Sequence, residues 1–252
     1  MVDHLELGHA LVTMIEPDRD TIVAYNEWYE RDHFLSGVLT GPGAFAGRRF
    51  AATRDLKALR FPEGSPVARP LDDGSFVTLY WIEQGQLGAH CDWGFPEAAR
   101  LAGLGRMNTD RHHVSTAYYD LAGTWSAHDD GVPVELALHH PYAGLVVVWE
   151  ATASADSGRQ LLAADLPIDR VVTLRPIELP DPLPAMPGVI VDAPADAPGP
   201  SDVVVHCCFL TEHPAAGWEG VAARIGAVTD PLLVAPFVPT VPGTRTYLDE
   251  LW

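Results

Sequence analysis

Asn26-Glu27-Trp28-Tyr29-Glu30-Arg31-Asp32-His33-Phe34 is the stretch of the sequence that decides the fold. It lies between two apolar segments, residues 8–16 and 44–53, which have the length and composition of strands. Pro17-Asp18 supplies a break and an N-cap, and a helical pattern runs from there to about Leu39. One face of this predicted helix carries Ile22, Asn26, Tyr29 and His33. The sequence therefore predicts a helix that packs on a sheet and brings a histidine to it.

The segments that follow extend this pattern. Gly41-Pro42-Gly43 ends the helix, residues 54–75 are predicted as a loop, and further strands are expected at 76–83 and 112–121, with a helix at 96–104. This order is that of the ferredoxin-like βαββαβ unit. The same order recurs in the second part of the chain, with predicted strands at 144–150, 170–177, 203–210 and 232–238 and helices at 157–164 and 218–227.

The recurrence predicts two domains in an α+β fold. Residues 1–125 would form one ferredoxin-like half, residues 143–252 a second and degenerate half, and the two would build an α+β barrel within one chain. Residues 126–142, which are rich in histidine, aspartate and small residues, are expected to be a solvated linker. A Pro-rich loop is expected at 178–201.

Composition excludes several classes of protein. The chain has 252 residues, of which 47% are hydrophobic, so it can build a core. The formal charge is 16 minus 34, or −18, which disfavours nucleic acid and anionic membranes as partners. No apolar run approaches the roughly 18 residues of a membrane span, and the first residues lack the pattern of a signal peptide. These features predict a cytoplasmic protein.

The sequence contains few of the residues and motifs that known cofactor and metal sites use. Lys57 is the one lysine, so a Schiff-base mechanism would depend on it alone. The cysteines Cys91, Cys207 and Cys208 form no CxxC pair, and small core residues are the simplest interpretation of the adjacent two. Phosphate-binding and nucleophile-elbow motifs do not occur.

The motifs W-Y-x-x-x-H and P-G-x-x-x-x-R-R-F resemble those of the EthD-like and related groups of the dimeric α+β barrel superfamily. They are carried here by Trp28, Tyr29, His33, Pro42, Gly43, Arg48, Arg49 and Phe50. The resemblance implies two ferredoxin-like sheets packed face to face, with a ligand pocket between each sheet and its own helices. The superfamily includes cofactor-free monooxygenases, polyketide cyclases and haem-binding enzymes, so fold alone does not select a reaction.

His33, Tyr29 and Asp32 are the predicted catalytic residues. An imidazole titrates near neutral pH and can accept and return a proton. Tyr29 lies one turn earlier and could donate to an oxyanion, while Asp32 could fix the imidazole tautomer. The competing interpretations are a helix-face histidine bonded to a carbonyl and a tyrosine that belongs to the core.

Other residues are predicted to bind substrate. Arg48 and Arg49 must point to opposite faces of their strand, so one of them could enter the pocket while the other pairs elsewhere. His112 and His113 alternate in the same way. The predicted substrate-binding set is Trp28, Arg48, Arg49, Tyr80, Trp81, His113 and Tyr119, the last in register with His113.

Two histidines with Asp32 would match an iron triad, but no spacing motif supports one, and no metal is predicted. Residues 159–165, the counterpart of the His33 region in the second half, contain no histidine, so the site is expected in the first half.

These features predict an enzyme of cyclase, dehydratase or isomerase type that moves a proton on a small, largely apolar organic substrate. No cofactor is predicted, with haem as the exception left open. The alternatives are a haem-binding protein or cofactor-free oxygenase, and a non-catalytic ligand-binding or interaction protein. A homodimer is left open as well.

Overall fold

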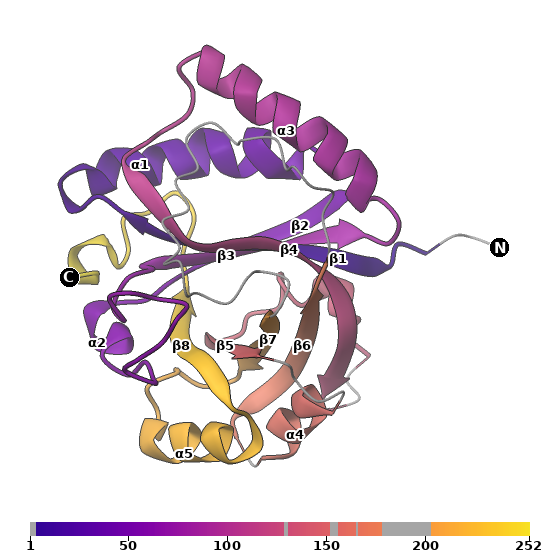
Figure 1. Cartoon of the computed structure of the whole chain (residues 1–252), viewed down its shortest axis with the longest axis vertical. Helices are drawn as coiled ribbons and strands as arrows, with labels where there is room; N and C mark the ends of the chain where they lie inside the picture. Colours follow the sequence, from indigo (N-terminus) through magenta and orange to yellow (C-terminus); the bar gives the residue numbers. More distant parts are fainter. Residues whose placement is uncertain (1–3, 129–130, 152–155, 165, 178–202) are drawn as a thin grey trace.

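The computed structural model describes residues 4–128, 131–151, 156–164, 166–177 and 203–252 (Figure 1). Eight antiparallel strands close into one barrel in the order β1-β3-β2-β8-β5-β7-β6-β4. The strands are β1 (Leu7–Pro17), β2 (Ala44–Ala51), β3 (Phe76–Glu83), β4 (Arg111–Ser126), β5 (Gly144–Ala151), β6 (Ile168–Pro176), β7 (Val203–Leu210) and β8 (Pro231–Pro239).

The strands of each part of the chain are neighbours in the barrel. The first four follow the order β4-β1-β3-β2 and the last four the order β8-β5-β7-β6. Two seams join the parts. At one, β2 pairs with β8 at Phe50 and Ala51, and at the other β4 pairs with β6 from Tyr119 to Ser126. The barrel is therefore closed by a single chain.

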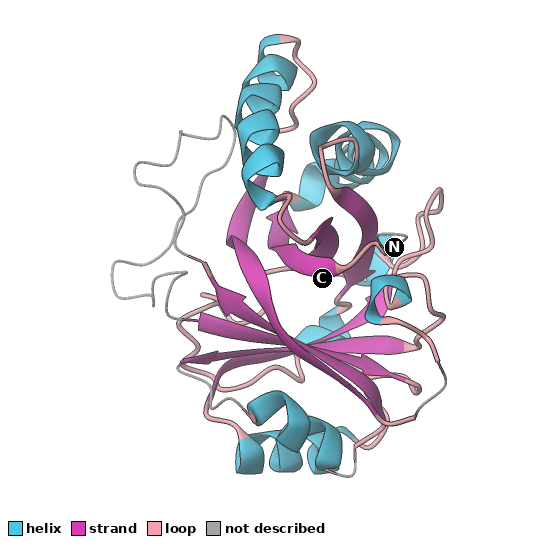
Figure 2. Cartoon of the chain, turned by 90° about the vertical axis from the view of Figure 1, so that its right-hand side faces the viewer, coloured by secondary structure: helices cyan, strands magenta, loops and turns pink. Residues whose placement is uncertain are grey.

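Helices cover two opposite sides of the barrel (Figures 1 and 2). The first side carries α1 (Ile22–Trp28), the π-helical turns η2 (Tyr29–His33) and η3 (Leu35–Leu39) that continue it, and α3 (Leu87–Gly103). The other side carries α4 (Ser157–Ala163) and α5 (Trp218–Val228). Short turns complete the described structure: η1 (Arg19–Thr21), α2 (Arg54–Lys57), η4 (Val134–Leu136) and η6 (Leu248–Glu250). No helix in the described ranges is long and apolar enough to cross a membrane.

Alternation along each strand separates the barrel interior from the helix-covered faces. On β3, Val77, Leu79 and Trp81 belong to the interior cluster, whereas Phe76 and Tyr80 pack beneath the helices. The interior is apolar and fully buried, and burial of this kind contributes about 25 cal/mol for each Å² removed from water. Trp81 is thus a core residue of the barrel.

The linker expected at 126–142 is solvated only in part: most of its described residues are exposed or half-buried, but three apolar residues are not. Ala137, Leu138 and Tyr142 are at most 3% exposed and join the interior cluster. The Tyr142 hydroxyl also donates to the Asp169 carboxylate at 2.9 Å. These three side chains therefore attach the segment to the barrel core. Residues 129–130, like the loop expected at 178–201, lie outside the described residues.

The helix expected at 96–104 begins at Leu87 instead. Pro96 lies inside it, whereas the sequence pattern predicts that the helix starts there. The residues before Pro96, including His90 and Trp93, pack around Gly41, where a Cβ atom would lie 2.6 Å from the Trp93 ring. Tertiary contacts thus extend the helix through a position that local propensity disfavours.

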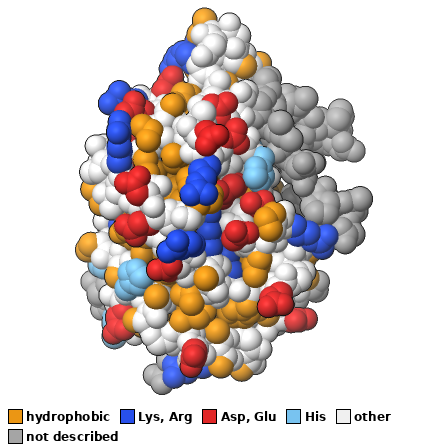
Figure 3. Space-filling view, turned by 90° about the vertical axis from the view of Figure 1, so that its left-hand side faces the viewer, with side chains coloured by type: hydrophobic (Ala, Val, Ile, Leu, Met, Phe, Trp, Pro, Cys, Tyr) orange, Lys and Arg blue, Asp and Glu red, His pale blue; other side chains and the backbone are white. Residues whose placement is uncertain are grey.

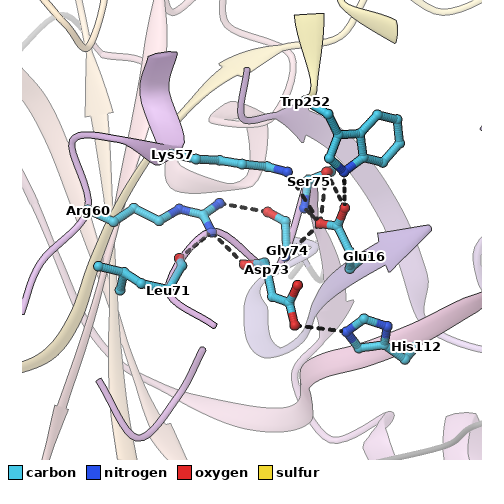
Figure 4. A network of polar contacts seen from close by, with 9 residues as sticks. All are labelled: Glu16, Lys57, Arg60, Leu71, Asp73, Gly74, Ser75, His112 and Trp252. Atoms are coloured by element: carbon cyan, nitrogen blue, oxygen red, sulfur yellow. Dashed lines mark hydrogen bonds and ion pairs between the residues drawn. The ribbon is translucent and has the colours of Figure 1, made fainter. Parts of the chain in front are cut away.

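A buried carboxylate fixes the C-terminus and the 54–75 segment to β1 (Figure 4). Glu16 accepts hydrogen bonds from the Ser75 amide at 2.6 Å, the Gly74 amide at 2.8 Å and the Trp252 indole at 2.9 Å. Lys57 Nζ lies 3.5 Å from the same carboxylate, and burial lowers the pKa of this lysine. Every oxygen of this buried group has donors, as a buried charge requires.

Charges of both signs are interspersed over the face in Figure 3, without an extended basic stripe.

Candidate functional site

A cavity of about 140 Å³ lies between the outer face of β1, β3 and β4 and the helices η2, η3 and α3. Much of its wall is apolar and comes from both layers: Leu11, Ile15, Val38, Phe95, Ala98, Met107 and Ala117. Its polar wall consists of Thr13, Tyr25, Tyr29, His33, Tyr80, Arg111, His113, Thr116 and Tyr118. The size is that of a cavity known to accept a benzene ring, about 150 Å³.

His33 reaches the cavity from the end of a π-helical turn, a feature that is frequent at functional sites. Its ring stacks on the Trp28 indole, with centroids 4.5 Å apart and planes at 19°. The Nδ1 edge lies against Gly37, where a Cβ atom would come within 2.6 Å. Nδ1 is buried with no hydrogen-bond partner in the described residues. We therefore assign the proton of the neutral ring to Nε2, because an N–H at Nδ1 would have no acceptor.

His113 enters the same cavity from β4 and is held by a chain of two hydroxyls. Its Nδ1 lies 2.7 Å from Thr116 Oγ1, which lies 2.8 Å from Thr13 Oγ1. Nε2 is buried, and the described residues provide it with no partner. A ring oriented through one nitrogen, with the other unpartnered, has the arrangement of a general base.

Both imidazoles are neutral at pH 7. Burial, then Arg111, lowers the pKa of His33 to about 3, against the opposing effect of Asp32. Burial, then Arg111 and the two neighbouring histidines, lowers the pKa of His113 to about 3. The sequence-based expectation of an imidazole titrating near neutrality does not describe the ligand-free site.

Arg111 is the charged residue of the cavity wall. The side chain is 5% exposed, and its Nη1 is buried without a hydrogen-bond partner in the described residues. Its guanidinium carbon lies 4.9 Å from the centre of the Trp28 ring, a cation–π contact. None of the described residues that line the cavity is acidic.

Tyr29 and Tyr80 also line the cavity, but their hydroxyl protons are used within the protein. Tyr29 donates to Thr78 Oγ1 at 2.8 Å, so the 2.6 Å contact between the two tyrosines is donated by Tyr80. Burial raises the pKa of both hydroxyls, which remain protonated. In this arrangement Tyr29 has no free proton for a substrate oxyanion.

Asp32 turns away from His33. Its carboxylate accepts two hydrogen bonds from Arg106 and one from Ser36 at 2.5 Å, and the Arg106 contact holds the pKa of this carboxyl below its usual range. It neither hydrogen-bonds the imidazole nor lines the cavity. The iron triad of two histidines and Asp32 is therefore not assembled among the described residues.

Arg48 and Arg49 point to opposite faces of β2, as strand alternation requires, and neither lines the cavity. Arg48 donates to the carbonyls of Leu138 and His140. Arg49 donates to Asn26 Oδ1 at 2.8 Å and lies 3.6 Å from the centre of the Phe76 ring. Both arginines join elements of the fold.

The structure separates other predicted residues from the cavity. Trp81 and Tyr119 belong to the barrel interior. Trp28 supports His33 from behind and donates to the Arg106 carbonyl at 2.7 Å. Tyr119 is displaced by an irregularity in β4, where Met14 pairs with Ser115 but Ile15 pairs with His113. This bulge at Val114 puts His113 on the face of Thr116 and Tyr118 and turns Tyr119 inward.

Sequence reasoning missed Arg111, Thr13, Thr116 and Tyr118. The alternation of Leu11, Thr13 and Ile15 on one strand face was a usable signal for Thr13. For Arg111 no sequence signal existed, because a charged residue at a strand end is usually exposed.

The corresponding face of the second part of the chain is packed. Leu161 of α4 and Val221 and Ile225 of α5 join Val146 and Val148 of β5 in one buried cluster. A fully buried imidazole, His206, is satisfied on both nitrogens, by Thr173 Oγ1 at 2.8 Å and Glu150 Oε2 at 3.0 Å. Unlike His33 and His113, it has no free ring nitrogen.

No protein-family model matches the chain, and no curated protein matches its sequence. Its structure is similar to that of an anthrone oxidase-like protein, with a TM-score of 0.51 and 10% identity over 95% of both chains. A putative chlorite dismutase gives a TM-score of 0.51 and 10% identity over 98% of this chain and 100% of that one. At these identities the comparisons show the fold alone.

The fold is similar to that of ferredoxin-like dimeric α+β barrel proteins, as the strand order and these structural neighbours indicate. This chain closes its barrel by itself and carries a cavity with two neutral histidines and a buried arginine.

Proposed function

We propose that the protein is an enzyme that transfers a proton on a small, largely apolar organic molecule bound in this cavity. The observation that carries the proposal is that His33 and His113 line one largely apolar cavity, and that His113 Nε2 is buried there with no hydrogen-bond partner in the described residues. Buried polar atoms are normally paired, so unpaired ones on a cavity wall are suited to a ligand.

The two imidazoles have different roles in this proposal. His113, oriented through Nδ1 by Thr116, accepts the proton on Nε2. His33 donates from Nε2 to the substrate oxygen where charge develops. The sequence-based prediction has His33 either abstract or return the proton, and its buried, unpartnered Nδ1 disfavours the tautomer that a base at Nε2 requires. Cyclisation, dehydration and isomerisation all use such a transfer.

The low pKa values set a condition on this mechanism. A conjugate acid with a pKa of about 3 is a poor match to neutral pH, where a base with a pKa near 7 is most effective. Negative charge that develops on the substrate beside Arg111 offsets the effect of the guanidinium and raises the pKa of both imidazoles. The base therefore becomes effective only with substrate in place.

Deuterium incorporation tests the proposal. Single-ring enolisable ketones and phenylacetaldehyde are incubated with the protein in D₂O, and exchange at the acidic C–H is followed by NMR. We expect exchange above the buffer rate, reduced about 100-fold or more in His113→Gln and about tenfold or more in His33→Gln. His112→Gln is the matched control, because its ring faces Asp73 outside the cavity. Equal rates in all four proteins would reject the proposal.

A haem protein is the second candidate, because neutral imidazoles with an unpartnered nitrogen are the usual ligands of haem iron. The volume of the cavity does not fit the group. Pockets for drug-sized ligands occupy roughly 300–1,000 Å³, and a porphyrin is larger than most of those ligands, whereas this cavity has about 140 Å³. An absorption spectrum with added haem tests this directly: a stoichiometric Soret band lost in His33→Gln or His113→Gln would restore the haem reading. Oxygen uptake in the exchange assay would favour the oxygenase alternative.

We propose further that the chain is a tandem, EthD-like protein, with halves at 1–125 and 143–252. The repeated strand order supports this: each part places its fourth, first, third and second strands in that sequence. We propose that the protein binds its small-molecule substrate and neither nucleic acid nor a membrane. We place it in the cytoplasm. A homodimer would need a surface other than the barrel seams, which the chain itself closes.

A further inference from the structure

Arg111 lies in a setting that is unfavourable for a cation without a counter-charge. It is 5% exposed, and no ion pair or side-chain hydrogen bond engages it in the described part of the chain. A buried charge without a partner destabilises a protein, so such charges are normally paired. The chain has 34 acidic residues, yet none of those in the described ranges reaches this guanidinium.

The surroundings of Arg111 explain its position only in part. The Trp28 ring gives it one aromatic contact, at 4.9 Å. Arg49, by comparison, is 4% exposed but has the Asn26 oxygen at 2.8 Å and Glu30 at 4.0 Å in addition to its aromatic rings. Arg111 thus differs from the other buried arginine beside these helices in lacking an anionic or carbonyl partner.

The rest of the cavity wall indicates what the part of a ligand away from Arg111 would be like. Leu11, Val38, Phe95 and Met107 also line the cavity and offer an apolar surface for one ring. The hydrogen-bond donor assigned to His33 Nε2 adds to the positive potential of the polar part of the wall. An anionic oxygen attached to an apolar body complements both parts of the wall.

We propose that Arg111 is the counter-ion for the ligand, and that the substrate is an apolar organic acid of about one ring, bound as its carboxylate or phenolate anion. This inference rests on the proposed function only in taking the cavity as the ligand site. It adds that the negative charge is present before any proton moves.

4-Nitrophenol tests the charge preference with one molecule in two forms. Its phenolate is coloured, so the ionised fraction can be measured at a pH where both forms are present. We expect wild-type protein to raise the phenolate fraction, with the anion bound about tenfold or more tightly than the phenol. In Arg111→Gln the sign should reverse, because an apolar cavity without a cation favours the neutral form. Arg100→Gln, which alters an exposed arginine, is the matched control.

Benzoate and benzamide extend the test to carboxylates. Calorimetry with wild-type protein should show benzoate binding about tenfold or more tightly than benzamide, and Arg111→Gln should abolish the difference while leaving benzamide affinity unchanged. A preference that survives in Arg111→Gln, equal binding of both compounds to wild type, or binding of no probe would overturn the inference. If the protein shows no proton exchange but still prefers anions, the proton-transfer proposal fails and the assignment of Arg111 as counter-ion stands. If the protein shows proton exchange but no preference for anions, the assignment of Arg111 fails and the proton-transfer proposal stands.

Thermal unfolding gives a readout that does not depend on ligand size. If the buried guanidinium has no counter-charge until an anion binds, removing it should stabilise the ligand-free protein. Arg111→Leu should then raise Tm in the absence of ligand by about 4 °C or more. A decrease of similar size would show that Arg111 holds the fold together through Trp28 and would contradict the proposal.

Discussion

A Cβ atom on Gly37 would lie 2.6 Å from Nδ1 of His33, so the position of the imidazole depends on the absence of a side chain one turn later. The atoms in conflict belong to a ring already fixed by stacking on Trp28, which leaves it little room to move.

Gly37→Ala should therefore displace His33 and weaken the site. We expect about a tenfold loss of proton exchange and of 4-nitrophenolate binding. Gly226→Ala in α5 is the control, since nothing lies within 4 Å of its Cβ position, and there the change should stabilise the helix by up to about 1 kcal/mol. Unchanged activity in Gly37→Ala would show that the ring position is not set by this contact.

The depressed histidine pKa values predict a loss of stability in mild acid. Unfolded histidine has a pKa near 6.5, whereas His33 and His113 are lowered to about 3, so the unfolded chain binds more protons between these values. The contribution is complete above pH 6.5 and is lost as the pH falls toward 3. Each histidine should add up to about 1.4 kcal/mol per pH unit to the slope.

Urea unfolding at pH 7, 6 and 5 measures this slope. His113→Gln should reduce the dependence on pH, and His112→Gln should change it less. Identical slopes in wild type and His113→Gln would mean that His113 is charged in the native protein at these pH values.

The Glu16 network predicts that the last residue contributes to stability without contributing to binding. Trp252→Phe removes the indole N–H that donates to Glu16 at 2.9 Å but keeps an aromatic ring at the position. Hydrogen bonds to charged groups contribute about 1.5–3 kcal/mol, so we expect a loss near the lower value for this partly buried contact. Urea unfolding checks the loss, and benzoate affinity should remain at the wild-type value. A variant as stable as wild type would show that Lys57 and the backbone amides suffice.

The packed and the hollow faces should respond differently to the same truncation. Leu161 is fully buried among close neighbours on the second face, whereas Leu11 is 8% exposed and borders the cavity. Leu161→Ala should lower the free energy of unfolding by about 2–5 kcal/mol. Leu11→Ala should cost about 1–2 kcal/mol, because a side chain beside a cavity has fewer contacts to lose. Equal losses would argue against the asymmetry of the two faces.

Much of the fold could be predicted from hydrophobic periodicity and from the Pro and Gly residues that end helices and strands. The ranges 76–83 and 203–210 match β3 and β7, and the predicted helix to Leu39 corresponds to η1 through η3. α3 was predicted too short because Pro96 signals a helix start and the residues before it lack periodicity. The burial of Leu138 and Tyr142 depends on contacts with distant strands, which local patterns do not contain.

The site was predictable where residues share an element and unpredictable where they do not. Tyr29, His33 and Tyr80 line the cavity, as their spacing on a helix and a strand suggested. Tyr119 was misplaced by one extra residue at Val114, since a bulge reverses the faces of all residues beyond it. Asp32 was expected to orient His33, but its carboxylate accepts hydrogen bonds from Arg106, a residue distant in sequence.

Closure of the barrel by one chain has a consequence for how this molecule can change. In a symmetric assembly of identical subunits, each substitution occurs in every copy, so an unpaired cation would destabilise both sides at once. Here Arg111 occurs once, and the opposite face keeps its full apolar packing as a reserve of stability. In a chain of this kind, substitutions that suit one face to chemistry can lower the stability of that face, because the apolar packing of the other face keeps the protein folded.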